Sequence, residues 1–95
     1  MSDIKALISL VSNDFEVEDN CSEAQLRAAL IKVFEYLVED NFNKLLQILY
    51  RADVDQYKLK ELLENTPDKS SAEIIADAYL NRQKAKVEFR KKYSR

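Results

Sequence analysis

The sequence SEAQLRAALIKVFEYLVED, from Ser22 to Asp40, decides the fold class. Its apolar residues recur at three- and four-residue spacing, which places them along one side of an α-helix. They are Leu26, Ala29, Leu30, Val33, Phe34, Leu37 and Val38. Ser22 and Gln25 have the spacing of a capping box, in which each side chain bonds to the other residue's backbone amide. The pattern predicts an amphipathic helix over residues 23–40.

The same periodicity predicts further helices on both sides of this one. The expected ranges are about 3–12, 42–52, 54–64 and 71–93. The first would be capped by Ser2 or Asp3, the third by Asp53 and the last by a capping box of Ser70 with Glu73. Whether residues 23–52 form one bent helix or two stays open at Asp40-Asn41.

The chain is therefore expected to be all-α, a compact bundle of four to five helices in a single domain over residues 1–95. Strand-like alternation never extends beyond a few residues. In the third expected segment, Tyr57, Leu59, Leu62 and Leu63 are expected to face the core. Beyond Arg82 the apolar pattern thins, which predicts a basic helical tail over residues 84–95 that projects from the body.

The composition excludes most familiar catalytic machinery. The 95 residues contain no glycine and no histidine. Glycine-rich phosphate loops need a residue without Cβ, and the common nucleophile triads and His-metal sites need an imidazole. We expect a non-enzymatic protein with no catalytic residues, no cofactor and no metal. Asp53 and Asp55 are expected to cap a helix, and Glu16, Glu18 and Asp19 to form a solvated connection.

The chain is expected to be cytoplasmic. Its single cysteine, Cys21, cannot form an internal disulfide, which favours a reducing compartment. The N-terminal stretch does not have the pattern of a signal peptide, and no apolar run approaches the length of a membrane span.

Three segments carry a family resemblance. They are Leu45–Val54 (LLQILYRADV), Ala72–Asp77 (AEIIAD) and Arg82-Gln83. They resemble a group of short all-helical bacterial proteins of unassigned function, over roughly residues 4–93. The resemblance implies an all-helical cytosolic protein and supplies no catalytic residue.

Charge is distributed unevenly along the chain. Residues 80–95 hold seven basic side chains and Glu88 as their one acid, while residues 1–79 hold eight basic and sixteen acidic side chains. This asymmetry suggests that the C-terminal helix contacts a protein partner or a second copy, in an interaction or adaptor module. The expected contact residues are Arg82, Lys86, Val87, Phe89, Arg90 and Tyr93. In a homodimer, the cations would pair with acids such as Glu16, Glu18 and Asp19.

Nucleic acid is the alternative partner for the same helix. Basic side chains interleaved with Phe89 and Tyr93 suit phosphate contacts and base stacking. Two features oppose this alternative: the sequence pI is 5.2, and Glu73 and Asp77 lie in the first turns of that helix, where a DNA-binding helix meets the phosphates.

Overall fold

The structure, a computed structural model, describes residues 4–93 and contains five α-helices and no strand over that range. The helices are α1 (Ile4–Val11), α2 (Glu23–Asp40), α3 (Phe42–Arg51), α4 (Gln56–Asn65) and α5 (Ser71–Tyr93). The all-α helical bundle predicted from the periodicity is confirmed. The cap predicted at Ser2 or Asp3 lies outside the described residues.

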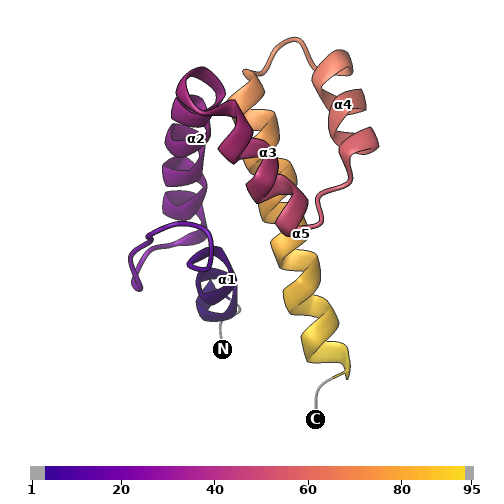
Figure 1. Ribbon diagram of the computed structural model, residues 1–95. Helices are drawn as coiled ribbons and strands as arrows, with labels where there is room; N and C mark the ends of the chain where they lie inside the picture. Colours follow the sequence, from indigo (N-terminus) through magenta and orange to yellow (C-terminus); the bar gives the residue numbers. More distant parts are fainter. Residues whose placement is uncertain (1–3, 94–95) are drawn as a thin grey trace.

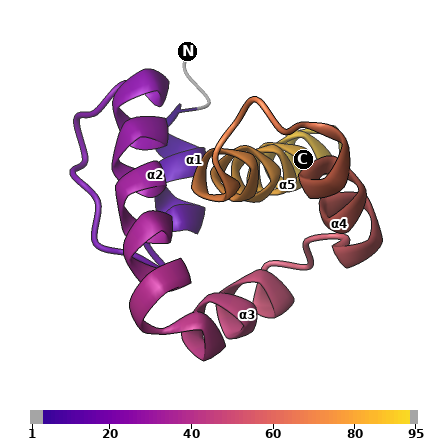
Figure 2. The ribbon, with the colours of Figure 1, turned by 90° about the horizontal axis from the view of Figure 1, so that it is seen from above.

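Helix α5 is the longest element, and the other helices are arranged around it. Helices α1 and α2 lie along one side of α5, and α4 lies on the other side (Figure 1). Seen from above, α2, α3 and α4 surround the N-terminal half of α5 on three sides (Figure 2). The C-terminal end of α5 extends beyond them, in a molecule with extents of 40 × 26 × 24 Å.

Three aromatic rings mark the centre of the core. Phe34 of α2 and Tyr79 of α5 are both 0% exposed, and their ring centroids lie 5.6 Å apart. Phe15, from the loop after α1, packs edge-on against both rings at 5.5 and 5.7 Å. Such pairs are stabilised beyond the area they bury. Phe15 therefore holds the acidic α1–α2 connection against the core.

Two of the predicted capping boxes are present. Ser22 Oγ accepts from the Gln25 amide at 3.1 Å while Gln25 Oε1 accepts from the Ser22 amide at 2.8 Å, so α2 begins where expected. Ser70 and Glu73 make the equivalent pair at the start of α5. Between α2 and α3, Asn41 leaves the helical region (φ −154°, ψ 67°) and its side chain caps α3. Residues 23–52 therefore form two helices.

The turn after α3 corrects the expected role of Asp53. The helix-capping side chain of α4 is that of Asp55, which accepts from the amides of Tyr57 and Lys58. Asp53 instead has φ 64°, the left-handed conformation that glycine most often supplies. Its amide donates to Tyr50 O and the Val54 amide donates to Leu49 O, which is a Schellman motif. In a chain without glycine, an aspartate ends this helix.

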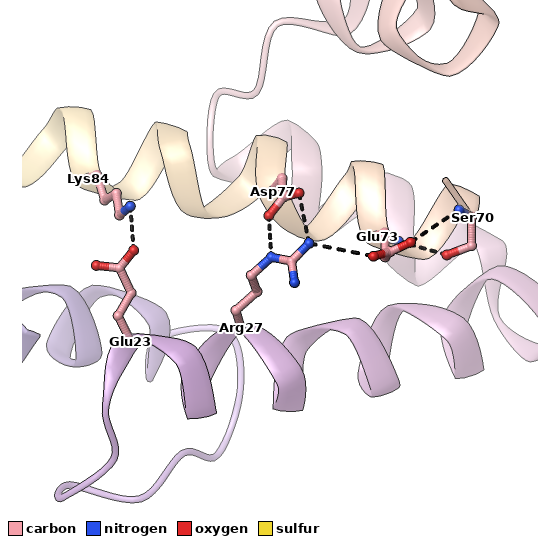
Figure 3. Close-up of polar contacts among 6 residues, drawn as sticks. All are labelled: Glu23, Arg27, Ser70, Glu73, Asp77 and Lys84. Atoms are coloured by element: carbon pink, nitrogen blue, oxygen red, sulfur yellow. Dashed lines mark hydrogen bonds and ion pairs between the residues drawn. The ribbon is translucent and has the colours of Figure 1, made fainter. Parts of the chain in front are cut away.

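Polar side chains tie α2 to α5 along one edge of their interface (Figure 3). Arg27 donates to Asp77 through Nε at 2.6 Å and through Nη2 at 3.1 Å. The same guanidinium lies 3.7 Å from Glu73, and Lys84 pairs with Glu23 two turns further along α5. Each contact joins one position on α2 to one on α5, so all of them fit a single register of the two longest helices.

Candidate functional site

The structure separates the six expected contact residues into two groups. Arg82 lies 3.8 Å from Asp53, within one molecule, and Lys86 is half-buried. Val87 is only 4% exposed and lies beside Ile4 and Leu7 of α1. Val87 therefore belongs to the interior and is unavailable to a partner, contrary to the expectation. Val87 and Phe89 are two residues apart on a helix, so Val87 lies on the opposite side of α5 from the Phe89 ring.

Phe89, Arg90 and Tyr93 form the exposed group, on the end of α5 that extends beyond the other helices. The rings of Phe89 and Tyr93 are 63% and 65% exposed, and their centroids are 4.6 Å apart. Lys92 Nζ lies 5.7 Å from the Tyr93 centroid, within the range of a cation–π contact. We call residues 88–93 the C-terminal end. It begins at Glu88 because Lys84 and Val87 are held against α2 and α1.

A second surface, a groove between α3 and α4, was not expected from the sequence. It encloses about 520 Å³ and its walls are mainly apolar. Helix α3 contributes Phe42, Leu45, Leu46 and Leu49, at the spacing of a single helix face. Helix α4 contributes Gln56, Tyr57, Leu59, Lys60 and Leu63, while Ser71 and Ile75 of α5 and Val38 of α2 complete it. We call this the α3–α4 groove.

The groove exists because α4 packs mainly on α5 and leaves α3 uncovered. Leu59 is the buried residue of α4. Tyr57, Leu62 and Leu63, which were expected in the core, are 89%, 47% and 36% exposed, so that expectation is wrong for these three residues. On α3, Phe42 and Leu46 are 52% and 43% exposed. The sequence did contain a signal for this exposed surface. Helices α3 and α4, of ten residues each, carry more apolar side chains than a single core-facing side of each helix can bury.

A partly buried polar cluster joins the loop after α1 to α3 and α5. The Tyr79 hydroxyl donates to Asp14 at 2.6 Å, and Arg51 donates to the other oxygen of the same carboxylate at 3.0 Å. Burial, with the hydrogen bond to Asp14, raises the pKa of Tyr79 above its ordinary value. The hydroxyl therefore stays protonated and acts as a hydrogen-bond donor. Arg51, the last residue of α3, thus pairs with an acid 37 residues away in the sequence.

The other acidic candidates do not converge. Asp53 and Asp55, two residues apart, serve Arg82 and the α4 amides respectively. Glu16, Glu18 and Asp19 are exposed on the α1–α2 loop. Across residues 4–93, no group of three or more acidic or cysteine side chains is placed to hold a metal ion. Cys21 is a half-buried free thiol.

Comparison with known proteins returns no relative. The sequence matches no protein-family model, no curated protein and no solved structure. The resemblance to short helical bacterial proteins therefore stays a prediction. Within the part of the chain that the structure describes, no helix is both long and apolar enough to cross a membrane.

Proposed function

We propose that the protein is a non-enzymatic protein–protein interaction module, and that the α3–α4 groove receives the apolar face of a helix. The observation that carries the proposal is the groove itself, with Phe42, Leu46, Tyr57 and Leu63 all exposed along it. Solvent-exposed apolar surface of this kind, concentrated in one concave place, is typical of an interaction site.

The shape of the groove favours a helical partner. Helices α3 and α4 supply most of its lining, with Val38 of α2 and Ser71 and Ile75 of α5. An apolar groove between helices is the kind of surface that receives an amphipathic helix in helix-in-groove complexes. Lys60 is the one charged side chain among its lining residues. A partner with bulky apolar side chains at positions i and i+4 would fill the groove and meet water only at the rim.

The proposed setting is the cytoplasm. Cys21 is a free thiol in a chain with no second cysteine, which suits a reducing compartment. The absence of histidine and glycine supports a role without catalysis, because acid–base and phosphate-binding chemistry usually depends on them.

Nucleic acid binding by the C-terminal end is the second candidate. The exposed rings of Phe89 and Tyr93, with Lys92 beside the second ring, favour it because bases stack on such rings. The acidic remainder of the chain opposes it, since phosphates are repelled by carboxylates.

Photo-cross-linking in the native cell tests the groove directly. Tyr57, on the groove wall, is replaced by p-benzoyl-phenylalanine, which keeps an aromatic side chain at an 89% exposed position. Tyr36 is the matched control, since it is 62% exposed on α2 and lies two residues from Val38, on the other side of that helix.

We expect position 57 to cross-link to one protein in high yield and position 36 to cross-link weakly or not at all. Mass spectrometry then identifies the partner, a second copy of the chain included. Equal yields from the two positions, or none from either, would contradict the proposal. Cross-links to nucleic acid from position 57 would also contradict it.

A further inference from the structure

The exposed apolar side chains of the molecule are concentrated in two places. Nine large hydrophobic residues among residues 4–93 are exposed. Four of them line the α3–α4 groove and two, Phe89 and Tyr93, lie on the C-terminal end. One surface is concave and the other is a protruding helix end with rings at positions i and i+4. The protruding C-terminal end and the concave α3–α4 groove are complementary in shape.

We propose that the C-terminal end of a second copy of this chain occupies the α3–α4 groove. This inference rests on the proposed function and names its partner. Phe89 and Tyr93 of one copy pack between α3 and α4 of the other, and the exchange is reciprocal. The protein is then a two-fold homodimer in which each subunit gives its helix end and receives one.

The geometry of α5 allows both contacts to form about a single two-fold axis. Ser71 and Ile75, at the start of α5, line the groove, while Phe89 lies near its end. From Ser71 to Phe89 the helix rises roughly 27 Å at 1.5 Å per residue. Two α5 helices placed antiparallel bring the end of each beside the start of the other. Such an isologous arrangement closes on itself and forms no filament.

Two acids of α4 add an electrostatic contribution to the proposed contact. Arg90, Lys91 and Lys92 lie between Phe89 and Tyr93 in the sequence. Helices α3 and α4 with the turn between them, residues 42–65, hold four carboxylates and four cations, so this segment has no net charge. Glu61 and Glu64 follow Tyr57 by four and seven residues, so helix geometry places them on the same side of α4 as Tyr57, although neither lines the groove itself. These two acids outnumber Lys60, the one charged side chain that lines the groove, and attract the incoming cations.

The area is sufficient for a reversible dimer. A fully buried Phe or Tyr side chain removes about 150–250 Å² from water. Four rings, already partly covered, and the groove walls that they contact together bury on the order of 1,000 Å², the lower end for a specific interface. We therefore expect a dimer that dissociates on dilution.

Sedimentation velocity of the purified full-length chain over a range of concentrations measures this equilibrium. Phe89→Ser alters the donated end and Leu46→Glu alters the receiving groove, both at exposed positions. Each should weaken dimerisation at least tenfold, whereas the control Tyr36→Ser should leave it unchanged. Circular dichroism and thermal unfolding report whether each variant folds. If Leu46→Glu does not fold, Tyr57→Ser tests the same groove at a more exposed position.

Mixing the two variants gives the decisive measurement. The Phe89→Ser chain keeps an intact groove and the Leu46→Glu chain keeps an intact end, so a mixed dimer recovers one of its two contacts. The mixture should associate more strongly than either variant alone. Association restored by mixing supports docking of the end in the groove, whereas a dimer whose stability neither variant changes overturns it.

The outcomes also separate this inference from the proposed function. A wild-type chain that stays monomeric at every concentration overturns the homodimer. If position 57 then cross-links to a different protein in the cell, the groove is still an interaction site and only its occupant was wrong. If there is no dimer and no cross-link, both proposals fail.

Discussion

Tyr79 shows how one hydroxyl connects three parts of this chain. It is fully buried on α5, yet its oxygen reaches Asp14 in the loop after α1, and Asp14 also binds Arg51 at the end of α3. The Asp14 side chain is only 10% exposed, so its charge depends on these two donors for compensation. Such a cluster is strongly coupled, because losing one donor leaves a nearly buried carboxylate with less compensation.

Replacing Tyr79 by phenylalanine tests this coupling. The ring and its contacts with Phe15 and Phe34 remain, so the change removes a single hydrogen bond to a charged group. We expect the free energy of unfolding to fall by about 2 kcal/mol, measured by urea denaturation. The control Tyr50→Phe, at a 76% exposed position, should change it by less than about 0.5 kcal/mol. Equal effects in the two variants would show that the Tyr79 hydroxyl contributes little.

The backbone conformation of Asp53 determines how α3 ends. Its φ of 64° suits aspartate and asparagine better than a β-branched residue. We expect Asp53→Val to lower the free energy of unfolding by about 2 kcal/mol. Asp53→Asn, which keeps the tolerance for this conformation but loses the 3.8 Å pair with Arg82, should cost less than about 1 kcal/mol. Similar losses in both would assign the effect to the ion pair.

At the scale of elements, most helix boundaries could be predicted because their signals are local. The capping boxes at Ser22 and Ser70 use side chains within three residues of the amides they serve, so spacing alone identifies them. The start of α4 was misplaced because Asp53 and Asp55 are both good capping residues, and only the backbone path after α3 distinguishes them. The sequence also left open whether the helix breaks or only bends at Asp40-Asn41, because the backbone path there cannot be read from residue spacing.

The Arg27–Asp77 pair between α2 and α5 predicts that the free energy of unfolding depends on pH in the acidic range. The Arg27 guanidinium, through its hydrogen bonds to Asp77, lowers the pKa of that carboxyl below its ordinary value of 3.8. A lowered pKa in the folded state means that the unfolded state binds protons more readily. The pair therefore stabilises the fold above about pH 4, and this contribution is lost as the pH falls through the folded-state pKa.

In the Asp77→Asn variant, the free energy of unfolding should therefore fall less steeply with decreasing pH than it does in the wild type. The measurement is urea denaturation at a series of pH values from about 6 down to 2. Asp19→Asn, on the exposed α1–α2 loop, is the control and should follow the wild-type curve. A wild-type curve that Asp77→Asn leaves unchanged would show that other carboxylates cause the acid loss.

For the whole molecule, the sequence identified one candidate surface and missed the other. The basic C-terminal end is visible because charge is a property of the residues themselves. The α3–α4 groove depends on where α4 packs. The apolar residues Phe42 and Leu46 on α3, and Tyr57 and Leu63 on α4, give the same sequence pattern whether they are buried or exposed. Val87 illustrates the converse. It departs from the stripe of Ala85, Phe89 and Tyr93, and it packs beside α1. Only the tertiary arrangement separates core from surface here.

The charge distribution predicts how the molecule as a whole responds to nucleic acid. An acidic body limits phosphate contacts to the C-terminal end, which offers about three cations. With three contacts, the affinity for DNA should fall roughly fortyfold between about 50 and 200 mM salt. Titration of labelled DNA and RNA at both concentrations should therefore show at most weak binding at the lower salt and none at the higher. Binding that persists at the higher salt and is lost on Lys91→Gln with Lys92→Gln would favour nucleic acid over protein as the partner. Leu46→Glu alters only the groove. Because the proposed dimer covers the C-terminal end, this variant should weaken self-association while leaving that end at least as accessible to nucleic acid as in the wild type, so a loss of nucleic acid binding in Leu46→Glu would contradict the assignment of phosphate contacts to this end.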